Sequence, residues 1–272
     1  MIIRVDGADT RIESYLAMTD VDARLRREAE GGFFMAEGDE VIRRALQAGL
    51  TPVSTLCSER WIPRLLEMGM PEGLPMYVAE TETLRAITGF RVHRGALAVF
   101  RRPATPSVAQ VVTHAKTVLL LEDLVDHANV GAGFRSAAAL GADCVVLSPR
   151  CADPLYRRAV KTSMGATLAL PWARSMDWAG DLADLTESGF ELWGLTPAPQ
   201  ADELDDAIRN PPSRIAVLAG TEGDGLTAAT LAACSRRIRI VMDSGVDSLN
   251  VAAATAVALH ALRAARKRAA RA

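Results

Sequence analysis

The sequence predicts an α/β protein in which a C-terminal domain with a parallel sheet follows a smaller α/β domain. Short apolar runs that are typical of strands alternate along the chain with segments of helical periodicity. The run TVLLLEDL at 117–124 is apolar at nearly every position, as expected for a strand buried on both faces of a parallel sheet. Polar loops follow this run and later ones, where α/β proteins commonly bind ligands.

The smaller domain is expected to occupy residues 1–103. Residues 20–30 have helical character, with arginines on the polar side. Strands are predicted over 33–38, 53–58, 75–80 and 96–102, and helices over 39–48, 62–69 and 82–90. This alternation predicts a small parallel or mixed α/β sandwich. Two prolines and a loss of periodicity then indicate a domain boundary, with a linker over 104–116.

The second domain is expected to occupy residues 117–272. Strands are predicted over 117–124, 144–148, 166–172, 191–196, 214–220 and 237–242. Helices are predicted over 134–141, 154–166, 177–188 and 226–234, and beyond residue 250. This order of elements predicts a doubly wound parallel sheet of five or six strands.

Composition excludes some classes of protein. Of the 272 residues, 49% are apolar and 24% are charged, so the chain can bury a sizeable core and is not globally disordered. The formal net charge of −2 excludes a uniformly basic nucleic-acid binder, although a local basic face stays open.

Cysteine spacing and hydropathy indicate the cellular setting. The cysteines are widely spaced and form no CxxC pair, which argues against a zinc site and a disulfide framework: Cys57, Cys144, Cys151 and Cys234. No apolar run approaches the roughly 18 residues needed to cross a bilayer. The N-terminal residues carry charges where a signal peptide needs an apolar core. We therefore expect a cytoplasmic protein with neither a metal nor a membrane partner.

Polar loops follow the predicted buried strands at 125–135, 219–226 and 242–250. Because the carboxyl ends of parallel strands meet at one edge of a sheet, we expect these loops to gather there. In the first loop, Asn129 could be a cap or turn residue and Arg135 a surface cation. Arg135 is expected in the first turn of a helix, where the helix dipole disfavours a cation, and this placement hints at a nearby phosphate.

The other two loops also allow a purely structural explanation. The glycines of GTEGDGL at 220–226 permit a tight turn, and a flexible acidic turn is the simpler interpretation. No Gly-Lys-Ser/Thr follows, and the acidic residues disfavour a nucleoside triphosphate. In the third loop, Ser248 and Asn250 stand where a helix N-cap is expected, so capping and a functional role are both open.

Taken together, the loops carry a resemblance to a known family. The segments N-V-G-x-x-x-R (129–135), G-x-E-G-x-G-L (220–226) and M-x-x-G-V-x-S-L-N-V (242–251) resemble the three motifs of SpoU-type, or TrmH-like, RNA 2′-O-ribose methyltransferases of the SPOUT class. They occur in the family's order. The N-terminal part resembles the family's L30e-like substrate-binding domain through AEGDEVIRRAL (36–46) and HRGALAVF (93–100), and residues 152–166 resemble the segment after the second strand.

The resemblance implies a fold, a cofactor and an assembly. It implies a C-terminal SPOUT domain with a trefoil knot that binds S-adenosylmethionine, and a homodimer with composite sites formed through that domain. The implied reaction is methylation of a ribose 2′-OH in structured RNA, either rRNA or tRNA. By position, the implied catalytic residues are Asn129, Arg135, Glu222, Ser248 and Asn250. The implied cofactor-binding residues are Thr196, Leu218, Ala219, Gly220, Ile240, Met242 and Leu249.

Some positions depart from the family's pattern. Thr221 stands where the family often has Asn, Val241 where it often has Pro, and Ala252 where Ser is common. The subfamily and the RNA target therefore stay open. Candidate phosphate contacts, each also explicable as a solvated surface charge, are Arg24, Arg26, Arg27, Arg43, Arg44, Arg91, Arg94, Arg157, Arg158 and Lys161.

Two alternatives come from other functional classes. A Rossmann-type oxidoreductase is disfavoured because the chain lacks GxGxxG and a suitably spaced acidic ribose ligand. A non-catalytic RNA-binding ribosome assembly factor on the same fold is disfavoured by the complete set of motif residues, and cofactor binding would separate it from an enzyme.

Overall fold

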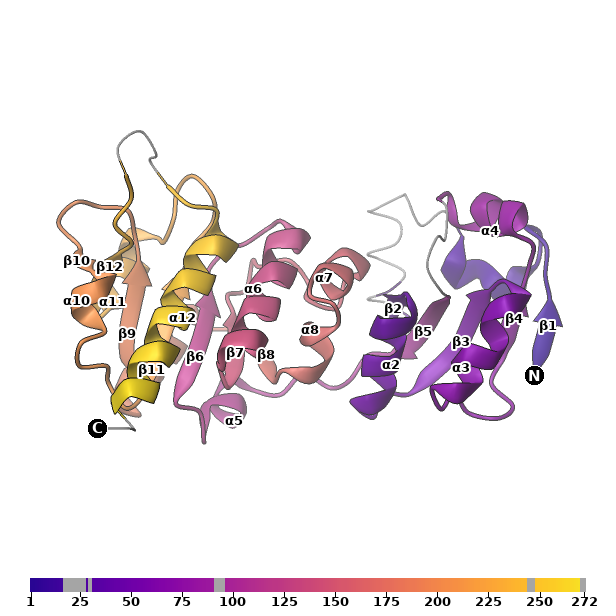
Figure 1. Ribbon diagram of the computed structural model, residues 1–272, viewed down its shortest axis with the longest axis horizontal. Coiled ribbons are helices and arrows are strands. Elements are labelled where there is room, and N and C mark those ends of the chain that lie inside the picture. Colours follow the sequence, from indigo (N-terminus) through magenta and orange to yellow (C-terminus); the bar gives the residue numbers. More distant parts are fainter. Residues whose placement is uncertain (17–27, 29–30, 91–95, 244–247, 270–272) are drawn as a thin grey trace. The chain divides into compact units, whose positions relative to one another are not determined.

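The computed structural model of the protein divides the chain into two compact units (Figure 1). Unit 1 comprises Met1–Ala104 and Leu155–Ala169, and unit 2 comprises Thr105–Pro154 and Leu170–Ala272. The structure describes residues 1–272 except 17–27, 29–30, 91–95, 244–247 and 270–272. The helix expected over 20–30 therefore lies outside the described residues, apart from Glu28.

The described part of unit 1 contains a five-stranded mixed sheet. Its strands are β1 (Ile2–Arg4), β2 (Phe33–Glu37), β3 (Pro52–Cys57), β4 (Met76–Val78) and β5 (Leu97–Arg101). They lie in the order β1-β4-β3-β5-β2, with β4 parallel to β1 and β3, and β5 antiparallel to β2 and β3. Strand β1 was not predicted, because it is a short edge strand beside charged residues and has little apolar pattern of its own.

Helices cover the sheet of unit 1 and close its core. They are η1 (Thr10–Tyr15), α2 (Asp39–Gln47), η2 (Glu59–Trp61), α3 (Ile62–Glu67) and α4 (Thr81–Thr88). The helical periodicity of α2 predicts an apolar face of Val41, Ile42, Ala45 and Leu46; the first three are buried and Leu46 is half-buried. On the opposite side of the unit, the buried Tyr15 hydroxyl lies 2.8 Å from Ser54 Oγ, so its polar atom is satisfied within the core.

Two later helices, α7 (Arg157–Thr162) and α8 (Ala166–Ala169), also belong to unit 1. The Glu37 carboxylate accepts from Arg157 Nη1 at 2.9 Å and from Lys161 Nζ at 2.6 Å. Arg44 Nη1 donates to the Met164 carbonyl at 2.8 Å. The strand predicted over 166–172 is wrong: its alanine-rich start is helical, and strand β8 (Trp172–Arg174) begins only after Pro171.

The described part of unit 2 contains a seven-stranded sheet in which all the pairs are parallel. Its strands are β6 (Thr117–Leu121), β7 (Cys144–Leu147), β8 (Trp172–Arg174), β9 (Glu191–Leu195), β10 (Asp202–Glu203), β11 (Ile215–Ala219) and β12 (Arg236–Arg239). Their order is β10-β12-β9-β11-β6-β7-β8. The predicted parallel sheet is confirmed, and the two-residue edge strand β10 is the addition that sequence analysis missed.

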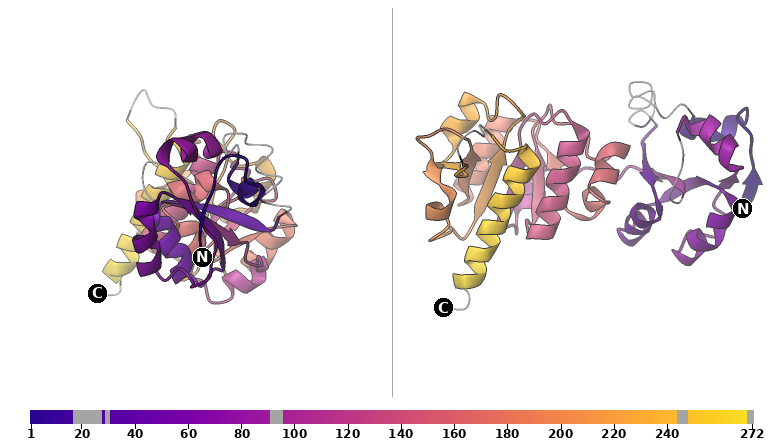
Figure 2. Two further views of the ribbon diagram at one scale, coloured as in Figure 1. Left: turned by 90° about the vertical axis from the view of Figure 1, so that its right-hand side faces the viewer. Right: turned by 45° about the horizontal axis from the view of Figure 1, so that its top comes forward.

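Helices cover both faces of this sheet. They are α5 (Val108–Val112), α6 (His127–Leu140), α9 (Trp178–Glu187), α10 (Leu204–Ala207), α11 (Ala228–Ala233) and α12 (Val251–Ala269). Helices α6 and α12 lie side by side on one face (Figures 1 and 2). Residues of α5, α9 and α11 pack into the core on the other face. Helix α5 lies within the stretch expected to be a linker, 104–116, and starts with a capping box between Ser107 and Gln110.

No helix in the described part of the chain is both long and apolar enough to cross a membrane. The cysteines are free thiols, with Cys57, Cys144 and Cys151 buried and Cys234 partly buried.

Candidate active site

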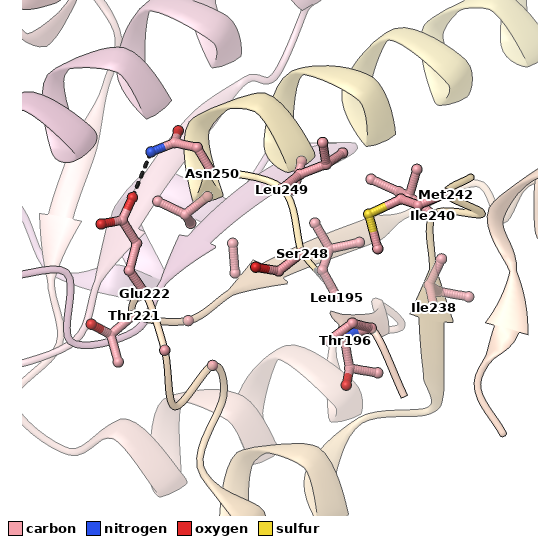
Figure 3. A pocket seen from close by; sticks show the side chains of 17 residues that line it. Leu195, Thr196, Thr221, Glu222, Ile238, Ile240, Met242, Ser248, Leu249 and Asn250 are labelled. Atoms are coloured by element: carbon pink, nitrogen blue, oxygen red, sulfur yellow. Dashed lines mark hydrogen bonds between the residues drawn. The ribbon is translucent and has the colours of Figure 1, made fainter. Parts of the chain in front are cut away.

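A pocket of about 280 Å³ opens at the carboxyl ends of β9, β11 and β12 in unit 2 (Figure 3). Its walls are the strand ends, the loops that follow them and the first turn of α12. The lining residues are Leu195, Thr196, Pro197, Ala219, Gly220, Thr221, Glu222, Gly223, Gly225, Ile238, Ile240, Met242, Ser248, Leu249, Asn250, Val251 and Ala254. This is the sheet edge where the second and third polar loops are predicted to meet.

Most of the expected cofactor residues line this pocket. They are Thr196, Ala219, Gly220, Ile240, Met242 and Leu249. Leu218, a residue of β11, is not among the lining residues, because its side chain is fully buried in the core of unit 2. Leu195, Pro197 and Ile238 also line the pocket and were not predicted; their places at or just after the ends of β9 and β12 could have indicated them.

The loop after β11 is a tight turn that only glycine permits at its ends. The Gly225 N–H donates to the Thr221 carbonyl at 3.0 Å, which closes the turn. A Cβ atom on Gly220 would lie 2.2 Å from the carbonyl carbon and oxygen of Gly225. Gly223 and Gly225 have φ of 90° and 69°, in the left-handed region that favours glycine. The loop therefore presents backbone and the Glu222 side chain to the pocket.

Asn250 connects three segments of the site through its side chain. Its Nδ2 group donates to Glu222 Oε1 at 2.5 Å and to Asn129 Oδ1 at 3.2 Å. Figure 3 shows the contact with Glu222 at the end of the pocket opposite Ile240 and Met242. Asn250 Oδ1 accepts from the Ala252 N–H at 2.9 Å, so the residue also caps α12. The capping interpretation is thus correct for Asn250, and the cap leaves its amide group available to the site.

Helix α6 begins earlier than the sequence indicates. Its N-cap is Asp126, whose side chain accepts from the Ala128 N–H at 2.8 Å, so Asn129 lies in the first turn and is not a cap. Gly133 lies inside the helix, where its missing side chain allows close packing on Leu121: an added Cβ would lie 3.3 Å from Leu121 Cδ1. The expected loop over 125–133 is therefore mostly helical.

Arg135 consequently lies in the middle of α6 and not in its first turn. The inference of a nearby anion from the helix dipole does not hold at this position. Arg135 is exposed and is not among the residues that line the pocket. Ser248, by contrast, lines the pocket beside Leu249.

A turn held by Asp123 connects β6 to α6. Asp123 has a positive φ of 56°, and its Oδ1 accepts from Ser148 Oγ at 2.7 Å. Its other carboxylate oxygen pairs with Arg150. Burial tends to raise the pKa of Asp123, but the hydrogen bonds from Arg150 and Ser148 outweigh burial and lower it below its ordinary value. These contacts fix the start of the helix that carries Asn129.

Several of the candidate RNA contacts pair with acidic residues of unit 1. Arg43 and Arg44 pair with Glu40, and Arg157 and Lys161 pair with Glu37. Arg158 is exposed. The remaining candidates lie outside the described residues: Arg24, Arg26, Arg27, Arg91 and Arg94.

The pocket can accept a ligand that has an extended apolar or planar part and a polar end. Side chains such as Leu195, Ile238 and Ile240 supply the apolar wall, and the glycine turn supplies backbone groups. Within the described residues there is no group of three or more His, Cys, Asp or Glu side chains that could hold a metal ion.

Comparison with known proteins identifies relatives. The model of the SpoU rRNA Methylase family matches residues 116–260, more than half of the chain. The chain is 43% identical over 256 residues to an uncharacterized tRNA/rRNA methyltransferase of Mycobacterium tuberculosis, covering 94% of this chain and 89% of the relative. It is 31% identical over 206 residues to a 23S rRNA (guanosine-2′-O-)-methyltransferase, RlmB, of Xanthomonas campestris, covering 72% and 82% of the two chains.

A solved structure supports the fold over nearly the whole chain. The AdoMet-bound crystal structure of an rRNA methyltransferase from Sinorhizobium meliloti superposes with a TM-score of 0.82, at 21% identity, and covers 98% of each chain. At this identity the likeness concerns the fold.

Proposed function

The chain belongs to the SpoU rRNA methylase family, and on that premise we propose that it methylates a ribose 2′-OH in structured RNA. The methyl donor would be S-adenosylmethionine, and the RNA would be rRNA or tRNA, which the enzyme would meet in the cytoplasm. The names of the relatives support this substrate class. The observation that carries the proposal is the meeting of Asn129, Glu222 and Asn250 beside a pocket walled by strand-end loops.

The residues of the pocket fit S-adenosylmethionine. The apolar side chains of Leu195, Ile238 and Ile240 suit the flat adenine ring, and the backbone of the glycine turn can approach a ligand closely because a Cβ at Gly220 is excluded. Glu222 places a carboxylate in the lining, which suits a ligand with cationic groups. When bound there, S-adenosylmethionine supplies an electrophilic methyl group on a sulfonium centre.

The residues of this chain must orient the attacking hydroxyl and release its proton. A ribose 2′-OH is a weak acid, so it has to be aligned with the methyl group while the proton leaves. We assign Ser248 to position the hydroxyl, and Asn250 and Asn129 to orient the ribose and the loops. Glu222 holds the Asn250 amide through the 2.5 Å hydrogen bond.

Arg135 is assigned to the RNA phosphate next to the target ribose. A guanidinium keeps its proton at neutral pH, so Arg135 acts as a charged clamp and not as a base. A bidentate contact with phosphate would also lower the cost of the negative charge that develops on the oxygen.

We further propose that the enzyme is a homodimer, formed through unit 2, with composite sites. Arg135 is exposed on α6 and does not line its own pocket, which suits delivery to the site of a second copy. The exposed side of the neighbouring helix α12 includes Val257, which is 41% exposed, and small alanine residues. Such a face can pack closely against a second copy.

For the architecture, we propose that unit 2 has the trefoil knot of the family and that unit 1 is its L30e-like substrate-binding domain. The joint lining of one pocket by the segments after β9, β11 and β12 suits a knotted chain end. In unit 1, Arg43, Arg44, Arg157 and Lys161 would supply phosphate contacts, alongside the exposed Arg158.

Transfer of radiolabelled methyl groups to RNA tests the proposed function. The full chain is incubated with labelled S-adenosylmethionine and with rRNA or tRNA fractions from a strain that lacks the gene. We expect label in one fraction, mapped to a 2′-O-methyl nucleotide. Label on a base would overturn the ribose assignment. Cofactor binding without transfer to rRNA, tRNA or ribosomal precursor particles would favour the non-catalytic assembly factor, and absence of cofactor binding would overturn the enzyme.

A further inference from the structure

Glu122 is a buried carboxylate that the proposed chemistry does not use. It directly follows β6, and only 3% of its surface is exposed. A charged group in such a place is costly unless hydrogen-bond donors surround it. Its partners therefore indicate why it is there.

The donors to Glu122 come from the start of helix α11. Its Oε2 accepts from the Thr227 N–H at 2.9 Å, and its Oε1 accepts from Thr227 Oγ1 at 2.9 Å and from Thr230 Oγ1 at 2.5 Å. Thr230 Oγ1 in turn accepts from Trp178 Nε1 at 3.0 Å. Thr227 is also the N-cap of α11, because its hydroxyl accepts from the Thr230 N–H at 3.2 Å.

The backbone of Glu122 contacts the other end of the loop that connects β11 to α11. Its N–H donates to the Ala219 carbonyl at 2.9 Å. Ala219 is the last residue of β11, and Thr227 directly follows the glycine turn 220–226. One residue therefore holds the entry of the turn through its backbone and the exit through its carboxylate. Between these anchors lie residues that wall the pocket, including Glu222.

We propose that Glu122 is a positioning residue for the reaction, which sets the glycine turn 220–226 against the pocket and keeps Glu222 within reach of Asn250. The assignment rests on the proposed function, since it concerns the same pocket. The turn is rich in glycine, and between its buried ends, Gly220 and Leu226, its residues are exposed or half-buried, so its placement depends on how those two ends are held. A carboxylate with fixed donors is suited to hold one end, because hydrogen bonds to charged groups are stronger than neutral ones.

Replacement of Glu122 by Gln tests this role, because Gln has nearly the same shape but sets an NH₂ group against hydroxyl or N–H donors. Calorimetric titration of the full chain with S-adenosylmethionine should show about tenfold weaker binding for E122Q. Thr230→Val should weaken binding in the same direction, whereas Thr230→Ser keeps the hydroxyl and should restore near wild-type affinity. In the double variant E122Q/T230V, the two losses of affinity for S-adenosylmethionine should not add, since both substitutions remove the hydrogen bond between Thr230 Oγ1 and Glu122 Oε1.

Asp143, an exposed carboxylate at the opposite end of β6, provides a control. Its Oδ2 accepts from the N–H groups of Lys116 and Thr117, each at 2.8 Å, so it also anchors backbone in unit 2. Asp143→Asn should lower the midpoint of thermal unfolding and leave the affinity for S-adenosylmethionine unchanged. A purely structural role for Glu122 would give E122Q the same result as D143N.

The outcomes separate the two proposals. If the wild-type chain binds no S-adenosylmethionine, the proposed function is overturned, and so is the assignment of Glu122 that rests on it. If the wild type binds and E122Q binds equally well, or D143N loses as much affinity as E122Q, the positioning role alone is overturned. Should E122Q fail to fold, the T230V and T230S pair decides: equal affinities in these two variants overturn the assignment.

Discussion

Asn250 Nδ2 lies 3.2 Å from Asn129 Oδ1, although 121 positions of the sequence separate the two residues. The contact ties the first turn of α6 to the start of α12, and the same amide group reaches Glu222. A single side chain therefore joins the three polar segments of the sequence, 125–135, 219–226 and 242–250. Because Asn250 also caps α12, its structural and functional contributions can be separated by choosing the substitution.

Asn250→Asp and Asn250→Ala should affect stability and turnover differently. Aspartate keeps the oxygen that caps α12, so N250D should unfold within roughly 0.5 kcal/mol of wild type, whereas N250A should lose about 1 kcal/mol. Both variants lack the amide donor, and N250D also sets a carboxylate against Glu222. We expect both to lose at least about tenfold in methyl transfer. Denaturant unfolding and labelled-methyl assays measure the two quantities, and full turnover in N250D would contradict a role for the amide.

Arg135→Ala should remove nearly all methyl transfer without unfolding the protein. The side chain is exposed, so the change in unfolding free energy should stay within about 0.5 kcal/mol. Loss of the phosphate clamp should lower the rate by about 10²–10³-fold while cofactor affinity is unchanged. Arg209→Ala, at another exposed arginine of unit 2, is the control and should retain wild-type turnover. Normal turnover in R135A would remove Arg135 from the mechanism.

Mixed dimers test whether the sites are composite. When R135A and Glu222→Ala chains are unfolded and refolded together in equal amounts, each mixed dimer should contain one site with both residues intact. Random pairing predicts about one quarter of wild-type activity, although each variant alone is inactive. If Arg135 serves its own pocket, the mixture stays inactive, and a monomeric mass in light scattering would also reject the dimer.

Gly220→Ala should collapse the turn that walls the pocket. The added Cβ would lie 2.2 Å from backbone atoms of Gly225, and backbone cannot move aside as a flexible side chain can. We expect a loss of roughly 1–3 kcal/mol in unfolding free energy and a loss of cofactor binding. Gly7→Ala is the matched control, because its Cβ would meet nothing within 4 Å. Wild-type affinity in G220A would show that the turn can rearrange without cost.

Stability should fall at alkaline pH because of the buried thiol of Cys144. Burial, together with the nearby Asp143 carboxylate, raises the pKa of Cys144 from 9.0 to about 12. Above pH 9 the unfolded chain releases this proton and the folded chain keeps it, so the free energy of unfolding decreases as pH rises towards 12. The contribution of Cys144 to this loss should reach about 2 kcal/mol near pH 10.5. Burial also raises the pKa of Cys57 to about 12, so the contribution of Cys144 is measured as the difference between wild type and Cys144→Ala in urea unfolding at pH 8 and 10.5. Equal losses of unfolding free energy in the two proteins would contradict the shift.

Much of the site could be predicted from the sequence because its position follows from the geometry of a parallel sheet. Strands that run parallel bring the residues after them to one edge, and this places Gly220, Glu222 and Asn250 together without knowledge of strand order. The glycines of the second loop predict a tight turn by themselves. The role of Asn250 as the N-cap of α12 could also be predicted, since its position before an alanine-rich run is a local feature of the sequence.

What could not be predicted depends on contacts between distant segments. Gly131 and Gly133 suggest a loop, yet they lie inside α6, and Gly133 is accommodated there by its contact with Leu121. The start of α6 in turn decides where Arg135 lies in the helix. Because the helix start was predicted too late, Arg135 was placed in the first turn, whereas it lies in the middle of α6. The strand order β10-β12-β9-β11-β6-β7-β8 likewise has no local signal.

The grouping of residues 155–169 with unit 1 affects how the protein can be divided into fragments. The family match over 116–260 includes this segment, although α7 packs beside β2 and its cations pair with Glu37. If the chain were cut once, after Ala104, the N-terminal fragment would lack helices α7 and α8. The C-terminal fragment would then carry Ala159 and Val160, apolar residues that are buried in the intact chain. A soluble N-terminal half therefore requires 155–169 to be grafted behind residue 104, with a short linker in its place in the other half.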